Sequence, residues 1–150
     1  PLCSNAAIDA IAQHYAALAR QNAIDLRIDI KLPEPLLFSE GDLCVVFGNL
    51  FENAVEACLR QNGANPFISV KLGISGKGSV VISIKNSYDH IICKKDDVFM
   101  SSKRHAEGIG IHSVRRITEK YSGFAKFNYD PHVFEASVLL NPAAQTAGRR

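Results

Sequence analysis

Apolar residues change their spacing several times along this chain, between the repeat of a helix and the repeat of a strand. Spacing of three and four residues predicts helices in three segments, at about 4–22, 41–61 and 108–122. Alternation with polar residues predicts five strands, at about 24–32, 68–74, 80–86, 124–129 and 133–140. This order predicts an α/β (α+β) two-layer sandwich, in which three helices cover one face of a mixed sheet.

The composition fits one globular domain over residues 1–150. The chain has 150 residues, of which 47% are hydrophobic and 21% charged, so it can bury a substantial core. Its formal net charge of +2 gives no sign of a nucleic-acid partner. Within the domain we expect an N-terminal helix at 1–22, a functional loop at 87–107 and a frayed tail at 141–150.

The cysteines indicate a reducing compartment. No two of the four are spaced as a CxxC pair, which argues against a zinc site, and free thiols are typical of cytoplasmic proteins. No apolar run is long enough to span a membrane, and no signal peptide opens the chain. Because the chain begins at Pro1, we expect a processed protein or an excised domain.

The second predicted helix carries an unusual polar stripe. Ser39 and Asp42 are spaced as a capping box at its start. Asn49 and Asn53 lie one turn apart, although asparagine is a poor residue for a helix interior. Their neutral amide oxygens suit a magnesium ion that already carries phosphate. The alternative is an ordinary solvated helix face.

Two glycines stand where a loop becomes the third predicted helix. Gly108 and Gly110 allow a backbone to approach a ligand closely, and the free N–H groups of a first helical turn favour phosphate. Lys103, Arg104 and His105 precede them and add positive charge. The alternative is a flexible glycine hinge.

Asn86 ends a predicted strand on its inward face. By alternation it shares that face with Ile82 and Ile84, while Lys85 points the other way. An amide at the mouth of an apolar pocket can bond the edge of a heterocycle. The alternative is an Asn-Ser turn that only ends the strand.

The segments "GNLFENAVEAC" and "SSK…EGIGIHSVRRITEKYSG", with the strand pairs around them, resemble the GHKL superfamily over nearly the whole chain. They are most similar to the histidine-kinase branch, especially citrate/dicarboxylate sensors and quorum-sensing receptor kinases of the accessory-gene-regulator type. The resemblance implies a Bergerat-type fold that binds ATP with Mg²⁺, and it makes segment 87–107 the ATP lid.

The resemblance also implies a role for each matching residue. Asn53 would be the magnesium ligand, and Asn49 would face the phosphates. Asn86 would stand where the family has an adenine-binding aspartate. Lys103 would be a phosphate partner, which makes Asn49 and Lys103 the candidate catalytic residues. The residues expected to approach the phosphates in the lid box are Gly108, Ile109 and Gly110.

Two glycine boxes depart from the family pattern. The DxGxG box reads "NSYDH", so Tyr88 and His90 replace its glycines. Ala106 replaces the first glycine of the GxGxG box. The quorum-sensing branch has degenerate first boxes, so the assignment stands. Nucleotide affinity stays open, and with it the alternative of a pseudokinase or a nucleotide-gated interaction module.

The predicted reaction is transfer of the γ-phosphate to a protein histidine. Hydrolysing members of the superfamily use a glutamate where this chain has Asn49, and an amide cannot act as a general base. His14 lacks the acidic neighbour of a phosphoacceptor, so the acceptor is expected on an upstream dimerisation domain. We therefore expect a cytoplasmic domain of a membrane-anchored, homodimeric receptor. Its partners would be that dimerisation domain and a response regulator, with no nucleic acid and no direct membrane contact.

Overall fold

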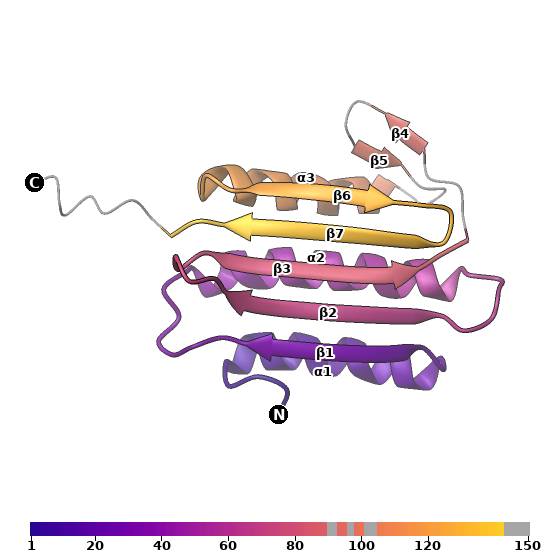
Figure 1. The fold of residues 1–150 in the computed structure, drawn as a ribbon, viewed down its shortest axis with the longest axis horizontal. Coiled ribbons are helices and arrows are strands. Elements are labelled where there is room, and N and C mark those ends of the chain that lie inside the picture. Colours follow the sequence, from indigo (N-terminus) through magenta and orange to yellow (C-terminus); the bar gives the residue numbers. More distant parts are fainter. Residues whose placement is uncertain (90–92, 96–97, 101–104, 143–150) are drawn as a thin grey trace, which may run out of the picture.

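The computed structural model describes residues 1–89, 93–95, 98–100 and 105–142 (Figure 1). Within this part of the chain, three helices and seven strands follow one another. The helices are α1 (Ala6–Gln21), α2 (Glu40–Leu59) and α3 (His105–Lys120). The strands are β1 (Asp25–Lys31), β2 (Phe67–Ile74), β3 (Val80–Ser87), β4 (Cys93–Lys95), β5 (Val98–Met100), β6 (Phe124–Tyr129) and β7 (Val133–Leu140).

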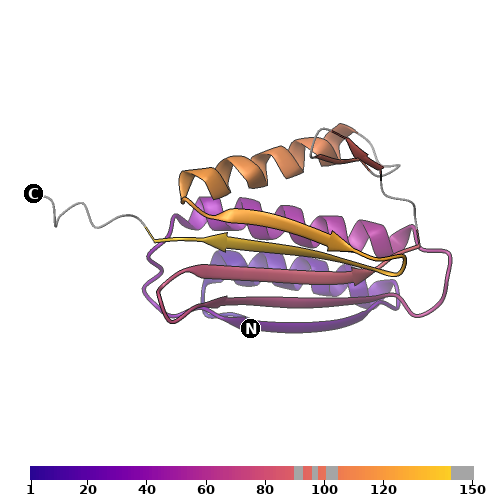
Figure 2. The same ribbon diagram turned by 45° about the horizontal axis from the view of Figure 1, so that its top comes forward.

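The main sheet has the strand order β1-β2-β3-β7-β6. Strand β1 runs parallel to β2, whereas β2/β3, β3/β7 and β6/β7 are antiparallel pairs. The helices lie together on one face of this sheet, as the turned view in Figure 2 shows. The predicted two-layer sandwich with a mixed sheet is therefore confirmed.

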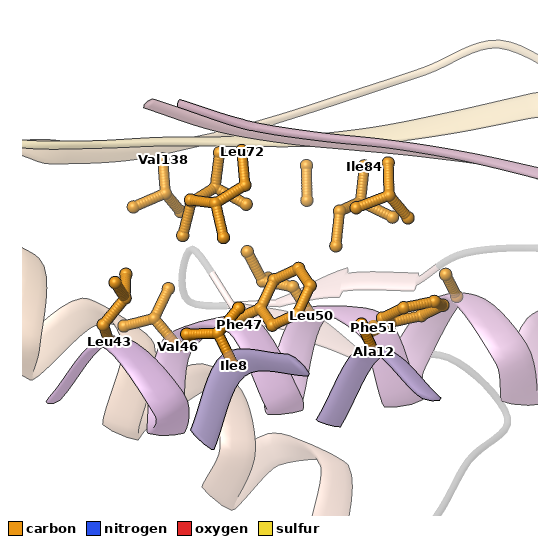
Figure 3. Packing of buried hydrophobic residues seen from close by; sticks show 14 of the residues in the cluster. Ile8, Ala12, Leu43, Val46, Phe47, Leu50, Phe51, Leu72, Ile84 and Val138 are labelled. Atoms are coloured by element: carbon orange, nitrogen blue, oxygen red, sulfur yellow. The ribbon is translucent and has the colours of Figure 1, made fainter. Parts of the chain in front are cut away.

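The core lies between the sheet and the helices. Phe47 and Phe51 of α2 are fully buried and meet strand residues such as Ile84 and Leu72 (Figure 3). Strand β3 alternates buried and less buried residues along most of its length, as the period of a half-buried strand requires. The opposite face of β1 is exposed and charged. Burial of this apolar layer is the main force that holds α2 against the sheet.

The helix starts differ in part from the sequence prediction. Ser39 caps α2 as expected, since its hydroxyl accepts from the Asp42 N–H at 3.2 Å. The first helix, in contrast, is capped by Asn5 and not by Ser4. The Asn5 side-chain oxygen accepts from the Ile8 N–H at 2.9 Å, and its amide also donates to Glu40 at the start of α2. This second bond gives Asn5 an advantage that a local pattern does not reveal.

The end of α2 also differs from the prediction. The helix stops at Leu59, with Arg60 as its C-cap, and does not run on to Gln61. Asn62 and Gly63 do not close it, because their N–H groups donate to the Asp89 carboxylate at 2.7 and 2.9 Å. This loop is therefore held by Asp89, which follows the end of β3.

The segment 87–107 contains more regular structure than its weak periodicity predicts. Ser87 still belongs to β3, β4 pairs with β5 in a hairpin, and α3 begins at His105 instead of near Gly108. Strands of three residues are too short to show alternation, which is why the sequence pattern missed them.

The predicted tail begins too early. Asn141 is fixed, since its N–H donates to the Tyr121 carbonyl at 3.2 Å and its side chain donates to the Ser122 carbonyl at 2.7 Å. Its side-chain oxygen also accepts from the Ser79 hydroxyl. Residues 143–150 of the predicted tail lie outside the described residues. In the part of the chain that the structure describes, we find no helix that is both long and apolar enough for a membrane span.

Candidate functional site

Four parts of the chain converge at one end of the molecule. The end of β3, the C-terminal part of α2, the β4–β5 hairpin and the start of α3 all lie on the right in Figure 1. The polar residues singled out from the sequence come mainly from these parts. The fold thus brings together segments that are far apart in the sequence.

Asn49 of α2 lies directly against the backbone of α3 at Gly110. A methyl group placed on Gly110 would come within 3.0 Å of the Asn49 side-chain oxygen, which is closer than a carbon atom normally approaches. Asn53 is half-buried on the same helix, one turn further on. The two segments that the sequence suggested for a phosphate and magnesium site are therefore in contact at Asn49 and Gly110.

The glycines of the third helix lie further into the helix than expected. Because α3 begins at His105, Gly108 and Ile109 belong to its first turns and Gly110 comes after them. The N–H groups that a helix start leaves unbonded thus precede Gly110. Lys103 lies outside the described residues, so the predicted contribution of its side chain stays a prediction.

Asn86 occupies the position that strand alternation predicts. It is only 3% exposed, on the same side of β3 as Ile84, whereas Lys85 is exposed. Its side-chain Nδ2 donates to the Ser87 carbonyl at 3.0 Å, so Oδ1 is the atom that remains to accept from a ligand. Strand β3 continues through Ser87, which rules out the alternative of an Asn-Ser turn.

Tyr88 replaces a glycine of the family's first box, and its side chain packs onto the β6–β7 hairpin. Its ring meets Phe134 edge to face at 6.4 Å, and its hydroxyl donates to the Asp130 carbonyl. Burial, and next the Asp130 carboxylate, raise the pKa of Tyr88, so the phenol stays protonated as a donor at neutral pH. A large side chain at this place is accommodated by β7.

Glu52 and Glu56 of α2 flank Asn53, and neither stands at the position of the missing glutamate. Burial raises the pKa of Tyr15 on α1, and the carboxylates of Glu52 and Glu56 raise it further. Both carboxylates are thus close enough to α1 to affect the ionisation of the Tyr15 phenol. Asn49 stands at the glutamate position, and its amide cannot act as a general base.

A polar cluster that the sequence did not predict joins the N-terminal end of α2 to the C-terminal end of α3. Asp42 accepts from the Lys120 ammonium and from the Tyr121 hydroxyl, each at 2.7 Å. The Tyr121 hydroxyl also accepts from the Ser39 N–H at 3.4 Å. Bonds from Lys120 and Tyr121 lower the pKa of Asp42 below its usual value. Together with the contact at Gly110, this cluster fixes the two helices in antiparallel register.

The described residues contain no group of three or more His, Cys, Asp or Glu side chains that could hold a metal ion. The oxygen that the structure places beside the glycines of α3 belongs to the Asn49 amide of α2. Such neutral donors suit an ion whose other ligands are phosphate and water.

Comparison with known proteins decides the family. A model described as a GHKL domain matches residues 39–141, from the cap of α2 to the end of β7. This chain is a GHKL domain. The match includes Asn49, Asn53, Asn86 and the glycines of α3. No curated protein matches the sequence.

Solved structures of histidine kinases share the fold of this GHKL domain. The nucleotide-free catalytic domain of histidine kinase ThkA is 22% identical, with a TM-score of 0.64 over 92% of each chain. The mycobacterial sensor histidine kinase MprB is 16% identical, with a TM-score of 0.60 over 91% of this chain and 97% of its own. The histidine kinase domain of a blue-light activated histidine kinase from Erythrobacter litoralis has a TM-score of 0.64 at 8% identity, over 91% of this chain. The GHKL domain spans 61% of that kinase domain.

Proposed function

We propose that this GHKL domain binds ATP with Mg²⁺ and transfers the γ-phosphate to a histidine on a dimerisation domain of the same receptor. The observation that carries the proposal is the contact between Asn49 and Gly110. It joins the asparagine helix to the glycine helix at the point where a nucleotide would need both.

Each part of the site has a separate task in this proposal. Asn53 offers an amide oxygen to the ion. Asn49 orients the phosphates against the N-terminal part of α3, where Gly108 and Ile109 lie in the first turns and Gly110 follows them. Lys103 would add positive charge, and Asn86 would accept from the amino group of the base. The bound Mg²⁺ would neutralise phosphate charge, which is most of what phosphoryl transfer requires.

Asn49 favours transfer over hydrolysis. An amide orients a phosphate but cannot take a proton from water, and neither Glu52 nor Glu56 is spaced to stand at the Asn49 position. The nucleophile must then come from a partner, for which an imidazole is suited. His14 lacks the acidic neighbour of a phosphoacceptor and His112 follows the glycines of α3, so we expect the acceptor histidine outside this domain.

If the acceptor histidine lies outside this domain, phosphotransfer requires protein partners. A separate histidine-bearing domain would receive the phosphate, and a response regulator would take it on. We expect the domain to act on the cytoplasmic side of a homodimeric, membrane-anchored receptor, as the sequence resemblance implies.

One observation supports a second candidate, a nucleotide-gated interaction module without phosphotransfer. Tyr88 stands where the family has a glycine, and it is bonded to the β6–β7 turn. This bond restricts the strand end beside the lid, and Ala106 adds a further departure. Such a module would bind ATP but transfer nothing.

Radioactive ATP separates the two candidates. The domain is incubated with Mg²⁺ and γ-labelled ATP, alone and with a separately supplied histidine-bearing dimerisation domain. A kinase labels the supplied domain with acid-labile phosphate and leaves itself unlabelled. Binding of ATP without any labelling would favour the interaction module, and acid-labile phosphate on His14 would contradict the expected position of the acceptor.

A further inference from the structure

Four consecutive residues, the last two of β3 and the two that follow it, contact three different parts of the fold. Asn86 bonds its neighbour Ser87, as described above. The Ser87 hydroxyl donates to Gln61 at 2.6 Å and accepts from the Phe67 N–H at 2.9 Å. Tyr88 bonds the β6–β7 turn and Asp89 bonds the loop after α2. The segment that replaces a glycine-rich box is therefore held tightly on several sides.

Tyr88 is held by a backbone hydrogen bond, a hydroxyl hydrogen bond and a ring contact. Its N–H donates to the His132 carbonyl at 3.0 Å, in addition to the hydroxyl bond to Asp130 and the ring contact with Phe134. Phe134 is also the residue paired with Asn86 across β3 and β7. The Tyr88 ring therefore packs on the neighbour of the predicted base ligand.

The turn that receives Tyr88 is itself rigid. The Asp130 carboxylate accepts from the N–H groups of His132 and Val133, at 2.7 and 2.8 Å. These bonds keep the pKa of Asp130 low, so the carboxylate is charged at neutral pH. Tyr88 is thus bonded to a turn that does not need a ligand to become ordered.

Asp89 forms the second anchor. One carboxylate oxygen accepts from both Asn62 and Gly63, which follow the C-terminal end of α2. A negative charge near the C-terminal end of a helix is unfavourable for the helix dipole. The two N–H bonds outweigh that cost, so the place of Asp89 is set by the loop that it holds.

We propose that Tyr88 and Asp89 are positioning residues, which hold Asn86 ready for the base of the nucleotide in place of the glycines of the family. This proposal rests on the proposed function. A preordered Asn86 loses little conformational freedom on binding, so the anchors add to affinity without touching the ligand. They act on the base end only, because the phosphates are assigned to α2 and α3.

The test compares a ligand that has a base with one that has none. Affinities for Mg-ATP and for Mg-tripolyphosphate are measured by calorimetry for the wild type, Tyr88→Phe, Asp89→Ala and Asp89→Asn. Tyr15→Phe is the control, since it removes a tyrosine hydroxyl from α1. We expect Tyr88→Phe and Asp89→Ala each to weaken ATP binding about fivefold and to leave tripolyphosphate binding unchanged. Asp89→Asn keeps an acceptor oxygen and should restore most of the ATP affinity.

Three outcomes would overturn the positioning role. ATP affinity that is unchanged in Tyr88→Phe and Asp89→Ala means that the anchors do not serve the base. Equal losses for ATP and tripolyphosphate mean that they only support the fold. Slow hydrogen exchange at Asn62 and Gly63 in Asp89→Ala means that the anchor is not formed as described. A wild type that binds neither ligand would overturn the proposed function itself, and if Asp89→Ala does not fold, the other two variants decide.

Discussion

The Asn49 side-chain oxygen lies only 3.0 Å from the position that a methyl carbon on Gly110 would occupy. Two helices that are far apart in the sequence thus meet through an amide and a bare backbone. The contact explains why Gly110 is a glycine even though α3 already has regular helical geometry there.

Replacing Gly110 with alanine tests this contact. Alanine is favoured over glycine inside a helix by about 1 kcal/mol, and the overlap with Asn49 offsets that gain, so unfolding free energy should change by less than about 1 kcal/mol. Displacement of the Asn49 amide should weaken ATP binding about tenfold. Gly76→Ala is the control, because a methyl group at Gly76 meets nothing within 4 Å. ATP affinity equal to that of Gly76→Ala would show that Asn49 has no part in the site.

Asn53→Ala should remove the ion's protein ligand with little effect on the fold, since the side chain is half-buried and lies outside the apolar core. Loss of an outer-shell partner alone commonly costs about tenfold in metal affinity, so a direct ligand should cost at least as much. A fluorescent ATP analogue titrated at increasing Mg²⁺ measures this. The variant should need about tenfold more Mg²⁺ for the same binding, and an unchanged Mg²⁺ requirement would remove Asn53 from the site.

The base pocket is tested at two neighbouring positions of β3. Asn86→Ala leaves the amino group of the base without an acceptor and should cost about 1–3 kcal/mol of ATP binding. Asn86→Asp should preserve or tighten binding, because a charged acceptor makes a stronger bond. Lys85→Ala is the matched control on the exposed side of the strand. A larger loss for Lys85→Ala than for Asn86→Ala in the same titration would contradict the base-binding role.

The cluster around Asp42 predicts a pH-dependent contribution to stability. Lys120 and Tyr121 lower the folded-state pKa of Asp42 below its usual 3.8. The stabilisation is therefore complete above that value and is lost as the pH falls through the folded-state pKa. Asp42→Asn should lower the unfolding free energy by less than about 1 kcal/mol at pH 7, and the difference should vanish in strong acid. Thermal melts checked against Asp29→Asn, on exposed β1, measure this; an equal deficit at all pH values would contradict it.

The sequence predicts best what depends on local periodicity. Alternation along β3 places Asn86 inward, and the short-range pattern at Ser39 identifies the cap of α2. The same reasoning chose Ser4 over Asn5, because the bond from Asn5 to Glu40 spans 35 positions.

The parts that the sequence did not predict depend on long-range contacts. The hydrogen bond from Tyr88 to Asp130 spans 42 positions, and the bond between Asp89 and Asn62 spans 27. Neither pairing leaves a periodic signal, so the box "NSYDH" looked like a loss of glycines. In the structure, Tyr88 and Asp89 of this box are bonded to segments far away in the sequence. Likewise the contact of Asn49 with Gly110 follows from the packing of α2 on α3, which no local rule specifies.

Calorimetric titration with ATP, in the presence and absence of Mg²⁺, shows whether the wild-type domain binds the nucleotide together with the ion. We expect saturable binding of one ATP per domain that is clearly tighter with Mg²⁺ and is lost on competition with excess ADP. Absence of ATP binding at millimolar concentration, or binding that Mg²⁺ does not affect, would contradict it.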